Sequence, residues 1–246
     1  MLGPCGAMTT LQGKDPADEM VRLLRGCALF EELDERDLKA LARMCRLRQV
    51  DRGTVVCSRG EPGDSMMIVS SGRVRISSVS IEGREIILNE ILAGQPFGEI
   101  AFLDGSERTA DATALERSRL LVLHRRDFQP FLRERVDLCI AVMQLLCGRL
   151  RHTTEQVEDL ALRSLEARLA RVILAFVASS GKEMGQDGIT VPLSLSQREL
   201  GEITGATRES VNKTLRSWRE MGLAELHDKT FHILDADGFS ALVDQL

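Results

Sequence analysis

Residues 97–110 read FGEIAFLDGSERTA, and this stretch decides how the N-terminal half of the chain folds and what it binds. A strand-like segment ends at Gly98, and a short helical turn follows whose free backbone N–H groups suit a phosphate. Arg108 can pair with a singly charged phosphate through two hydrogen bonds, and Thr109 can donate one more. Glu99 can accept from a ribose hydroxyl. A surface hairpin could also carry a Glu and an Arg, but the whole pattern favours an anion-binding site.

Short β-rich runs surround this stretch and are separated by turn residues. They include Thr54–Cys57, Met66–Val69, Val74–Val79, Glu85–Leu88 and Leu120–Leu123, with glycines between them. Strands at this spacing are typical of a β-sandwich or jelly roll. Helical spacing precedes them in residues 20–46, where Asp34 is a candidate N-cap. The fold class predicted is therefore α+β, beginning with a β jelly roll.

One long helix is predicted from about Pro130 to Leu162, because the only glycine inside this segment is Gly148 and no other proline occurs. Two series run through it at intervals of seven residues: Val136, Met143, Leu150, Val157, and Ile140, Cys147, Thr154, Ala161. Their alternating spacing of three and four is that of a coiled-coil seam. We expect two copies of the chain to pair here; the alternative is a single helix lying on its own domain.

Two adjacent hydroxyls belong to this helix. Thr154 occupies a seam position and is expected to face the partner helix. Thr153 is the preceding residue on the helix and is expected to face the β jelly roll of its own chain. Neither hydroxyl is typical of a dry seam, so a polar partner is expected beside them. The alternative is that each hydroxyl bonds back to its own helix.

The C-terminal segment begins near residue 163 and contains two short helices, predicted at 197–203 and 208–221. Ser196 and Glu199 form a capping box at the start of the first helix. Gly205 stands at the turn, where a positive φ favours glycine, and Thr207 can cap the second helix. A strand-like run at 189–193 and a hairpin at 224–234 flank the pair.

The second of these helices has two distinct faces. Val211, Leu215 and Trp218 fall on one stripe and should pack inward. The other face carries Arg208, Glu209, Asn212, Lys213 and Arg216. Residues 206–219 hold four basic side chains and one acidic one, although the whole chain has a net charge of −5. A solvated face explains any single charge, but the combination is typical of a helix that reads the major groove of DNA.

Two segments carry a resemblance to a known family. FGEIAFLDGSERTA is similar to the phosphate-binding cassette of cyclic-nucleotide domains, and GATRESVNK at 205–213 resembles the winged helix-turn-helix of the cAMP-receptor branch of the Crp/Fnr family. The resemblance implies ligand contacts from Phe97, Gly98, Glu99, Ile100, Arg108, Thr109, Arg149, Thr153 and Thr154. It implies DNA contacts from Ser196, Gln197, Thr207, Arg208, Glu209, Asn212, Lys213 and Arg216. The family usually has arginine at position 213, and lysine lacks the planar fork of arginine.

This resemblance implies a homodimeric transcription regulator that binds a cyclic nucleotide, near-palindromic double-stranded DNA and RNA polymerase, the last through residues 179–188. A threonine at the position of Thr109 suits cGMP in some relatives, whereas the pair Thr153 and Thr154 suits cAMP. We favour cAMP as the ligand and keep cGMP as an alternative. We expect no metal site, because no metal-ligand motif occurs. We expect no enzymatic activity, because no spacing of a nucleophile and a base occurs. A regulatory subunit of a kinase or channel would share the cassette but would lack the helix-turn-helix.

The nearest alternative is a redox or gas sensor of the same family that does not bind a cyclic nucleotide. Such a protein would need clustered N-terminal cysteines or a haem-ligating histidine, but Cys5, Cys27, Cys45 and Cys57 are widely spaced. The cysteines are interpreted as reduced thiols. No apolar run approaches the ~20 residues of a membrane span and no secretory signal is evident, so a cytoplasmic protein is predicted. The expected division is a flexible tail at 1–19, a ligand-binding domain at 20–130, a dimerisation helix at 131–163 and a DNA-binding domain at 164–246.

Overall fold

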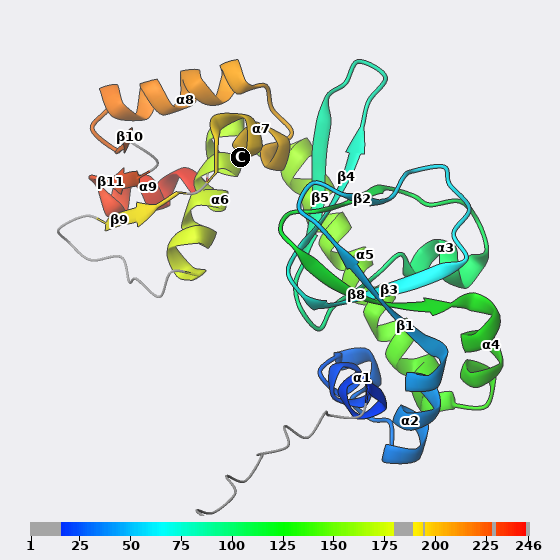
Figure 1. Cartoon of the computed structure of the whole chain (residues 1–246). Coiled ribbons are helices and arrows are strands. Elements are labelled where there is room, and N and C mark those ends of the chain that lie inside the picture. Colours follow the sequence, from blue (N-terminus) through cyan, green and yellow to red (C-terminus); the bar gives the residue numbers. More distant parts are fainter. Residues whose placement is uncertain (1–15, 180–188, 194, 228–229, 245–246) are drawn as a thin grey trace, which may run out of the picture.

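The computed structural model describes residues 16–179, 189–193, 195–227 and 230–244. Figure 1 shows a β-barrel and a smaller C-terminal lobe, joined by a long helix that runs along the barrel. Helices and sheets are both present in each lobe, which confirms the predicted α+β class. No helix in these residues is long and apolar enough to span a membrane.

The N-terminal helices pack at one end of the barrel. They are α1 (Pro16–Arg25), the 3-10 helix η1 (Ala28–Phe30) and α2 (Glu35–Met44). Asp34 caps α2 as predicted, because its Oδ1 accepts from the backbone N–H of Asp37 at 2.7 Å. The helix α1 begins inside the segment 1–19 that was predicted as a flexible tail; the rest of that segment, including Cys5, lies outside the described residues.

Two antiparallel four-stranded sheets form the barrel, in the orders β1-β8-β3-β6 and β2-β7-β4-β5. The strands are β1 (Cys45–Val50), β2 (Val55–Cys57), β3 (Ser65–Ser71), β4 (Val74–Val79), β5 (Glu85–Ile91), β6 (Pro96–Phe97), β7 (Asp111–Ala114) and β8 (Ser118–His124), with helix α3 (Glu99–Asp104) after β6. Val69, Val74 and Leu120 are fully buried between the sheets. The glycine-punctuated runs therefore fold into the expected barrel.

Two helices, not one, follow the barrel. They are α4 (Arg125–Arg133) and α5 (Val136–Leu162), so the prediction of a single helix from Pro130 is wrong at its start. Arg135 stands at the break with φ −133°, donates to both carboxylate oxygens of Asp37 at 2.7 and 2.8 Å, and lies 3.6 Å above the ring of Phe131. The two hydrogen bonds to Asp37 connect the break to the distant helix α2. Pro130 does not begin the long helix but lies inside α4.

The helix α5 has one face on the barrel and another in solvent. Leu138 and Val142 are buried in the core that lies under α1, α2 and α4. The predicted seam is exposed in the single chain, where Leu150 is 69% and Val136 73% accessible. The helix therefore lies on its own domain and also presents an uncovered apolar stripe.

The C-terminal lobe is a small helical domain with a three-stranded antiparallel sheet in the order β10-β11-β9. Its elements are α6 (Leu165–Ser179), β9 (Ile189–Pro192), α7 (Gln197–Thr204), α8 (Arg208–Glu220), β10 (Ala224–His227), β11 (Thr230–Ile233), α9 (Ala236–Ala241) and the 3-10 helix η2 (Leu242–Asp244). Trp218 is fully buried, with its ring 5.0 Å from that of Phe239. Residues 180–188, predicted to touch RNA polymerase, lie outside the described residues.

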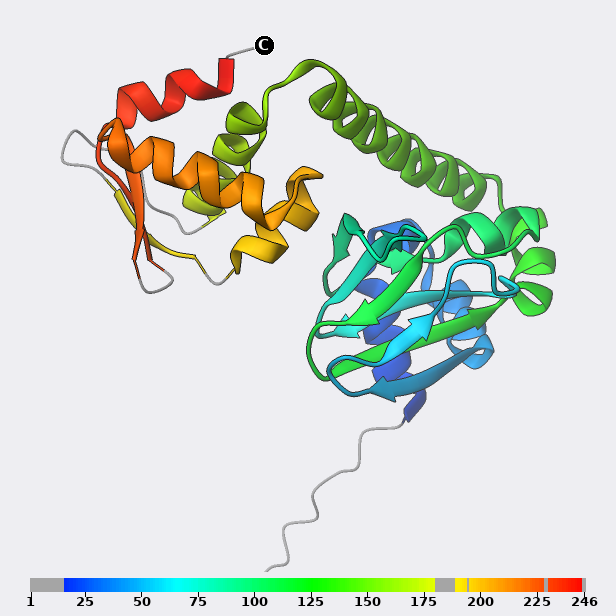
Figure 2. The ribbon, with the colours of Figure 1, turned by 90° about the horizontal axis from the view of Figure 1, so that it is seen from above.

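The two lobes meet through α7 and the β4–β5 hairpin. Figure 2 shows α7 on the side of the C-terminal lobe that faces the barrel, and Arg75 of β4 forms ion pairs with Glu199 and Glu202 of α7. The end of α5 contacts the same region, because Leu160 lies against Gly205.

Candidate ligand pocket and nucleic-acid interface

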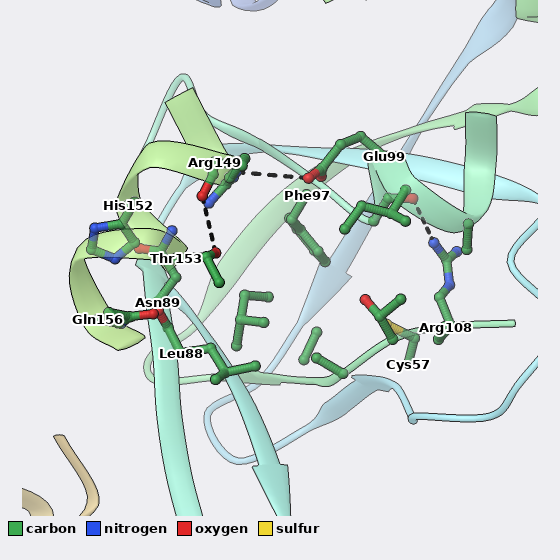
Figure 3. Close-up of a pocket in the computed structure, with 17 residues that line it drawn as sticks. Cys57, Leu88, Asn89, Phe97, Glu99, Arg108, Arg149, His152, Thr153 and Gln156 are labelled. Atoms are coloured by element: carbon green, nitrogen blue, oxygen red, sulfur yellow. Dashed lines mark hydrogen bonds and ion pairs between the residues drawn. The ribbon is translucent and has the colours of Figure 1, made fainter. Parts of the chain in front are cut away.

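A pocket of about 860 Å³, including its open mouth, lies between the barrel and α5. Figure 3 shows side chains from both sheets, from α3 and from α5 pointing into it. The lining residues are Cys57, Ile76, Leu88, Asn89, Phe97, Gly98, Glu99, Ile100, Ala101, Arg108, Thr109, Ala110, Ala112, Arg149, His152, Thr153 and Gln156.

A buried guanidinium marks one end of the pocket. Arg108 is 6% exposed and donates to the carbonyl of Gly98 at 2.9 Å and to the hydroxyl of Ser65 at 3.0 Å. Gly98 has φ +76°, and a Cβ there would lie 2.5 Å from Nη1 of Arg108, so backbone geometry and close approach both require glycine. The cation is thus fixed at the start of α3.

The Cys57 thiol lines the same pocket. Burial raises its pKa, and the nearby charge of Arg108 opposes that shift by a smaller amount. The thiol is therefore neutral near pH 7 and adds no negative charge beside Arg108.

Helix α5 is attached across the pocket at two points. Arg149 donates to the carbonyl of Pro96 at 2.8 Å, and its Nε lies 3.7 Å from Oε1 of the buried Glu99. Further along α5, Gln156 donates to the carbonyl of Leu88 at 2.9 Å. The pocket is consequently closed on one side by the helix that also carries the exposed seam.

The two threonines of α5 differ in position. Both are exposed in the single chain, but Thr153 lines the pocket and Thr154 does not. Both hydroxyls donate back to their own helix, to the carbonyls of Arg149 and Leu150, each at 3.0 Å. This is the alternative that the sequence left open, and it leaves both hydroxyl oxygens available as acceptors. The single chain does not bring Thr154 to its own pocket.

Nine lining residues were not predicted as ligand contacts: Cys57, Ile76, Leu88, Asn89, Ala101, Ala110, Ala112, His152 and Gln156. The last two follow Arg149 at intervals of three and seven, and helical periodicity would have placed them on one face with it. Ile76 and Asn89 are paired in the register of β4 and β5, a pairing that depends on closure of the barrel. No local signal marks them.

The predicted helix-turn-helix geometry is present in α7 and α8. Ser196 accepts from the backbone N–H of Glu199 at 3.2 Å, while Glu199 accepts from the backbone N–H of Ser196 at 2.9 Å. Gly205 has φ +68°, and Thr207 caps α8 by accepting from the backbone N–H of Ser210 at 3.1 Å. A Cβ at Gly201 would lie 2.7 Å from the carbonyl oxygen of Ala206, so this glycine permits the tight turn.

Helix α8 has a buried apolar face and an exposed polar face, as predicted. Val211, Leu215 and Trp218 are buried. The predicted reading residues form the outward face: Thr207, Arg208, Glu209, Lys213 and Arg216 are exposed, and Asn212 is half-buried. On α7, Ser196 is exposed and Gln197 is half-buried. A groove-reading helix needs such an accessible face near its N-terminus.

Comparison with known proteins identifies both halves of the chain. Residues 47–135 match the cyclic nucleotide-binding domain, and residues 167–242 match the Crp-like helix-turn-helix domain. A protein that joins these two domains is a DNA-binding transcription regulator with a cyclic-nucleotide-binding module. The chain belongs to the Crp/Fnr family, which confirms the resemblance in the sequence.

Relatives match over nearly their full length. The CRP-like cAMP-activated global transcriptional regulator of Mycobacterium tuberculosis is 28% identical over 218 residues, which are 89% of this chain and 97% of the relative. The cyclic AMP receptor protein of Thermus thermophilus is 26% identical, over 87% and 95% of the two chains. A Crp/Fnr regulator structure from Eubacterium rectale shares the fold with a TM-score of 0.72 at 18% identity, covering 90% and 100%.

Proposed function

We propose that this chain is a homodimeric transcription regulator that binds cAMP in the barrel and near-palindromic double-stranded DNA through α8. The observation that carries the ligand proposal is the buried Arg108, held by Gly98 and Ser65 at the start of α3. Within the described residues no ion pair to Arg108 is present, so an anionic ligand would stabilise this buried cation.

The cyclic phosphate would bind at Gly98, Arg108 and Thr109, with Phe97 and Ile100 beside it. Glu99 would accept from the ribose 2′-hydroxyl, and the ion pair with Arg149 would hold that carboxylate in place. The names of relatives from Mycobacterium tuberculosis and Thermus thermophilus, which refer to cAMP, support a cyclic-nucleotide ligand.

The choice of cAMP over cGMP rests on Thr153. Its hydroxyl proton is used by the carbonyl of Arg149, so the oxygen is left as an acceptor facing the pocket. Adenine presents an amino donor at position 6, whereas guanine presents a carbonyl acceptor there. We therefore expect cAMP to bind more tightly and cGMP to compete weakly.

Dimerisation is supported by the seam of α5. Ile140, Met143, Leu150 and Val157 form an exposed apolar stripe along one face, and an uncovered stripe of this length is typical of an interface. Pairing would also place Thr154 of each copy toward the ligand of the other. Two α8 helices set about 34 Å apart could then enter successive major grooves.

The test is calorimetric titration with cAMP and with cGMP, followed by gel-shift titration of a near-palindromic duplex selected from a random pool by the protein. We expect cAMP to bind the wild-type chain and to strengthen its DNA binding. Arg108→Ala should abolish cAMP binding while its thermal unfolding stays cooperative. Unaltered cAMP binding by Arg108→Ala would remove the pocket assignment. An absorbance spectrum of the purified protein showing haem or iron–sulfur bands would favour the redox or gas sensor.

A further inference from the structure

The residue Arg75 connects the wall of the pocket to the DNA-binding lobe. Arg75 and Ile76 are consecutive in β4, so their side chains point to opposite faces of the sheet. Ile76 lines the pocket beside Asn89, its partner in the register of β4 and β5. Arg75 reaches α7 on the other face, so one strand contacts both sites.

The ion cluster around Arg75 is largely buried. Its Nη2 donates to Oε1 of Glu199 at 3.3 Å, and Nη1 lies 3.7 Å from Oε2 of Glu202. The side chain of Arg75 is only 13% exposed and that of Glu202 only 9%. Because buried ion pairs depend strongly on geometry, a small shift of β4 against α7 changes their energy markedly.

The charge of Arg75 is compensated by the other lobe. Every ion pair that Arg75 makes within the described residues goes to α7, and its Nε is buried with no partner there. Glu199 also closes the capping box of α7 with its second oxygen. Glu202 receives a further hydrogen bond from Arg198 at 2.7 Å. The cluster therefore joins the barrel to the start of the helix-turn-helix.

A second contact fixes the other end of α7. A Cβ on Gly205 would lie 2.7 Å from Leu160 of α5 and 3.9 Å from Ile86 of β5. The backbone N–H of Ala206 donates to the carbonyl of Gly201 at 2.8 Å, so the turn that leads into α8 moves with α7. A displacement of β4 and β5 is thus transmitted to the reading helix.

We propose that Arg75 is a positioning residue that couples ligand binding in the barrel to DNA binding by α8. The inference rests on the proposed function. A ligand in the pocket would touch β4 and β5 through Ile76 and Asn89. The Arg75 cluster requires α7 to lie against β4, so another arrangement of the two lobes would break it. A contact made in one arrangement alone is what allows a ligand to shift the balance between them.

The experiment compares Arg75→Met with Arg73→Met, in the full-length chain. Arg73 lies just before β4, is half exposed and pairs only with Glu90 and Glu116 of the barrel among the described residues. Each variant is titrated with cAMP by calorimetry, and with the selected duplex in the presence and absence of saturating cAMP. We expect Arg75→Met to lower the ratio of these two DNA affinities at least fivefold, with cAMP affinity changed less than threefold.

Further variants separate coupling from a purely structural role. Arg75→Lys keeps the charge and should retain part of the ratio of DNA affinities with and without cAMP. Glu202→Gln removes the acidic partner of Arg75 and should also lower this ratio. In the double variant Arg75→Met/Glu202→Gln the losses should be less than additive. Hydrogen exchange of α7 amides, measured without ligand or DNA, should be faster in Arg75→Met than in Arg73→Met.

An unchanged ratio in Arg75→Met, or equal effects of Arg75→Met and Arg73→Met, would overturn the coupling role. Failure of the proposed function gives a different result, because the wild-type chain would then show no cAMP binding or no effect of cAMP on DNA affinity. Faster α7 exchange with an unchanged ratio would assign Arg75 to lobe packing alone and would also overturn the proposal.

Discussion

The guanidinium of Arg149 on α5 lies 3.7 Å from the carboxylate of Glu99 on α3, and both side chains line the pocket. Glu99 is buried, and Arg149 is its ion-pair partner across the pocket. The same pair links the barrel to the helix that carries the apolar seam. A ligand that hydrogen-bonds Glu99 would therefore be connected to α5 through one intervening side chain.

Replacing Arg149 by methionine should weaken cAMP binding by about 2 kcal/mol, roughly 30-fold in Kd, because the buried carboxylate of Glu99 loses its cationic partner and is no longer held in place. Calorimetric titration measures the change. Arg151→Met is the matched control, since Arg151 is exposed on the same helix and does not line the pocket. Equal cAMP affinity for Arg149→Met and the wild type would contradict the role given to this ion pair.

Leu150→Glu should dissociate the dimer. Each copy would lose an apolar side chain and gain a charge at the seam, at a cost of at least about 3 kcal/mol per dimer. Analytical ultracentrifugation measures the dissociation constant, with Glu155→Lys as a control for an exposed charge change away from the seam. Cys147, exposed in the single chain, should be alkylated faster in Leu150→Glu than in the wild type. A wild-type chain that sediments as a monomer would refute the pairing.

Thr154→Ala should weaken cAMP-dependent DNA binding more than it weakens cAMP binding, because Thr154 lies outside its own pocket and would act on the ligand of the partner. Thr153→Ala, which alters the lining of the pocket itself, should lower cAMP affinity directly. Calorimetry and gel-shift titration of the two variants provide the comparison. Proportional losses of both activities in Thr154→Ala would exclude a role across the dimer.

Glu209→Ala should relax base preference at one position of each half-site, by about 1–3 kcal/mol of discrimination, because Glu accepts from the amino group of cytosine. Arg216→Ala should instead weaken binding to all sequences similarly, as loss of a phosphate contact does. A gel-shift series over single-base variants of the selected duplex distinguishes the two. An unchanged base preference in Glu209→Ala would show that the readout assignment is wrong.

Two buried thiols should make stability depend on pH in the alkaline range. Burial raises the pKa of Cys27 to about 11 and that of Cys45 to about 12, from an ordinary value of 9.0. Above pH 9 the unfolded chain releases these protons while the folded chain retains them, so the free energy of unfolding falls as pH rises. Denaturant titration from pH 8 to 10 should show a smaller fall in Cys45→Ala. Iodoacetamide at pH 8 should leave both thiols unmodified in the native protein.

The sequence by itself determined the features that depend on neighbouring residues. The heptad series of α5, the capping box at Ser196 and the positive φ at Gly205 involve interactions within about four residues, and these patterns hold whatever packs against them. The phosphate cassette is similarly local, because Gly98 and Arg108 are close in the chain and meet across one short helix. For these reasons both modules and eight of the seventeen residues that line the pocket could be predicted.

Only the tertiary structure decided features that join distant parts of the chain. At the break before α5, Arg135 reaches Asp37, which is 98 residues away, and no local signal marks this contact. Asn89 enters the pocket because the barrel closes, and Arg75 meets Glu199 across 124 residues because the two lobes dock. Contacts at such separations are set by the packing of whole elements, so periodicity and propensity along the chain carry no information about them.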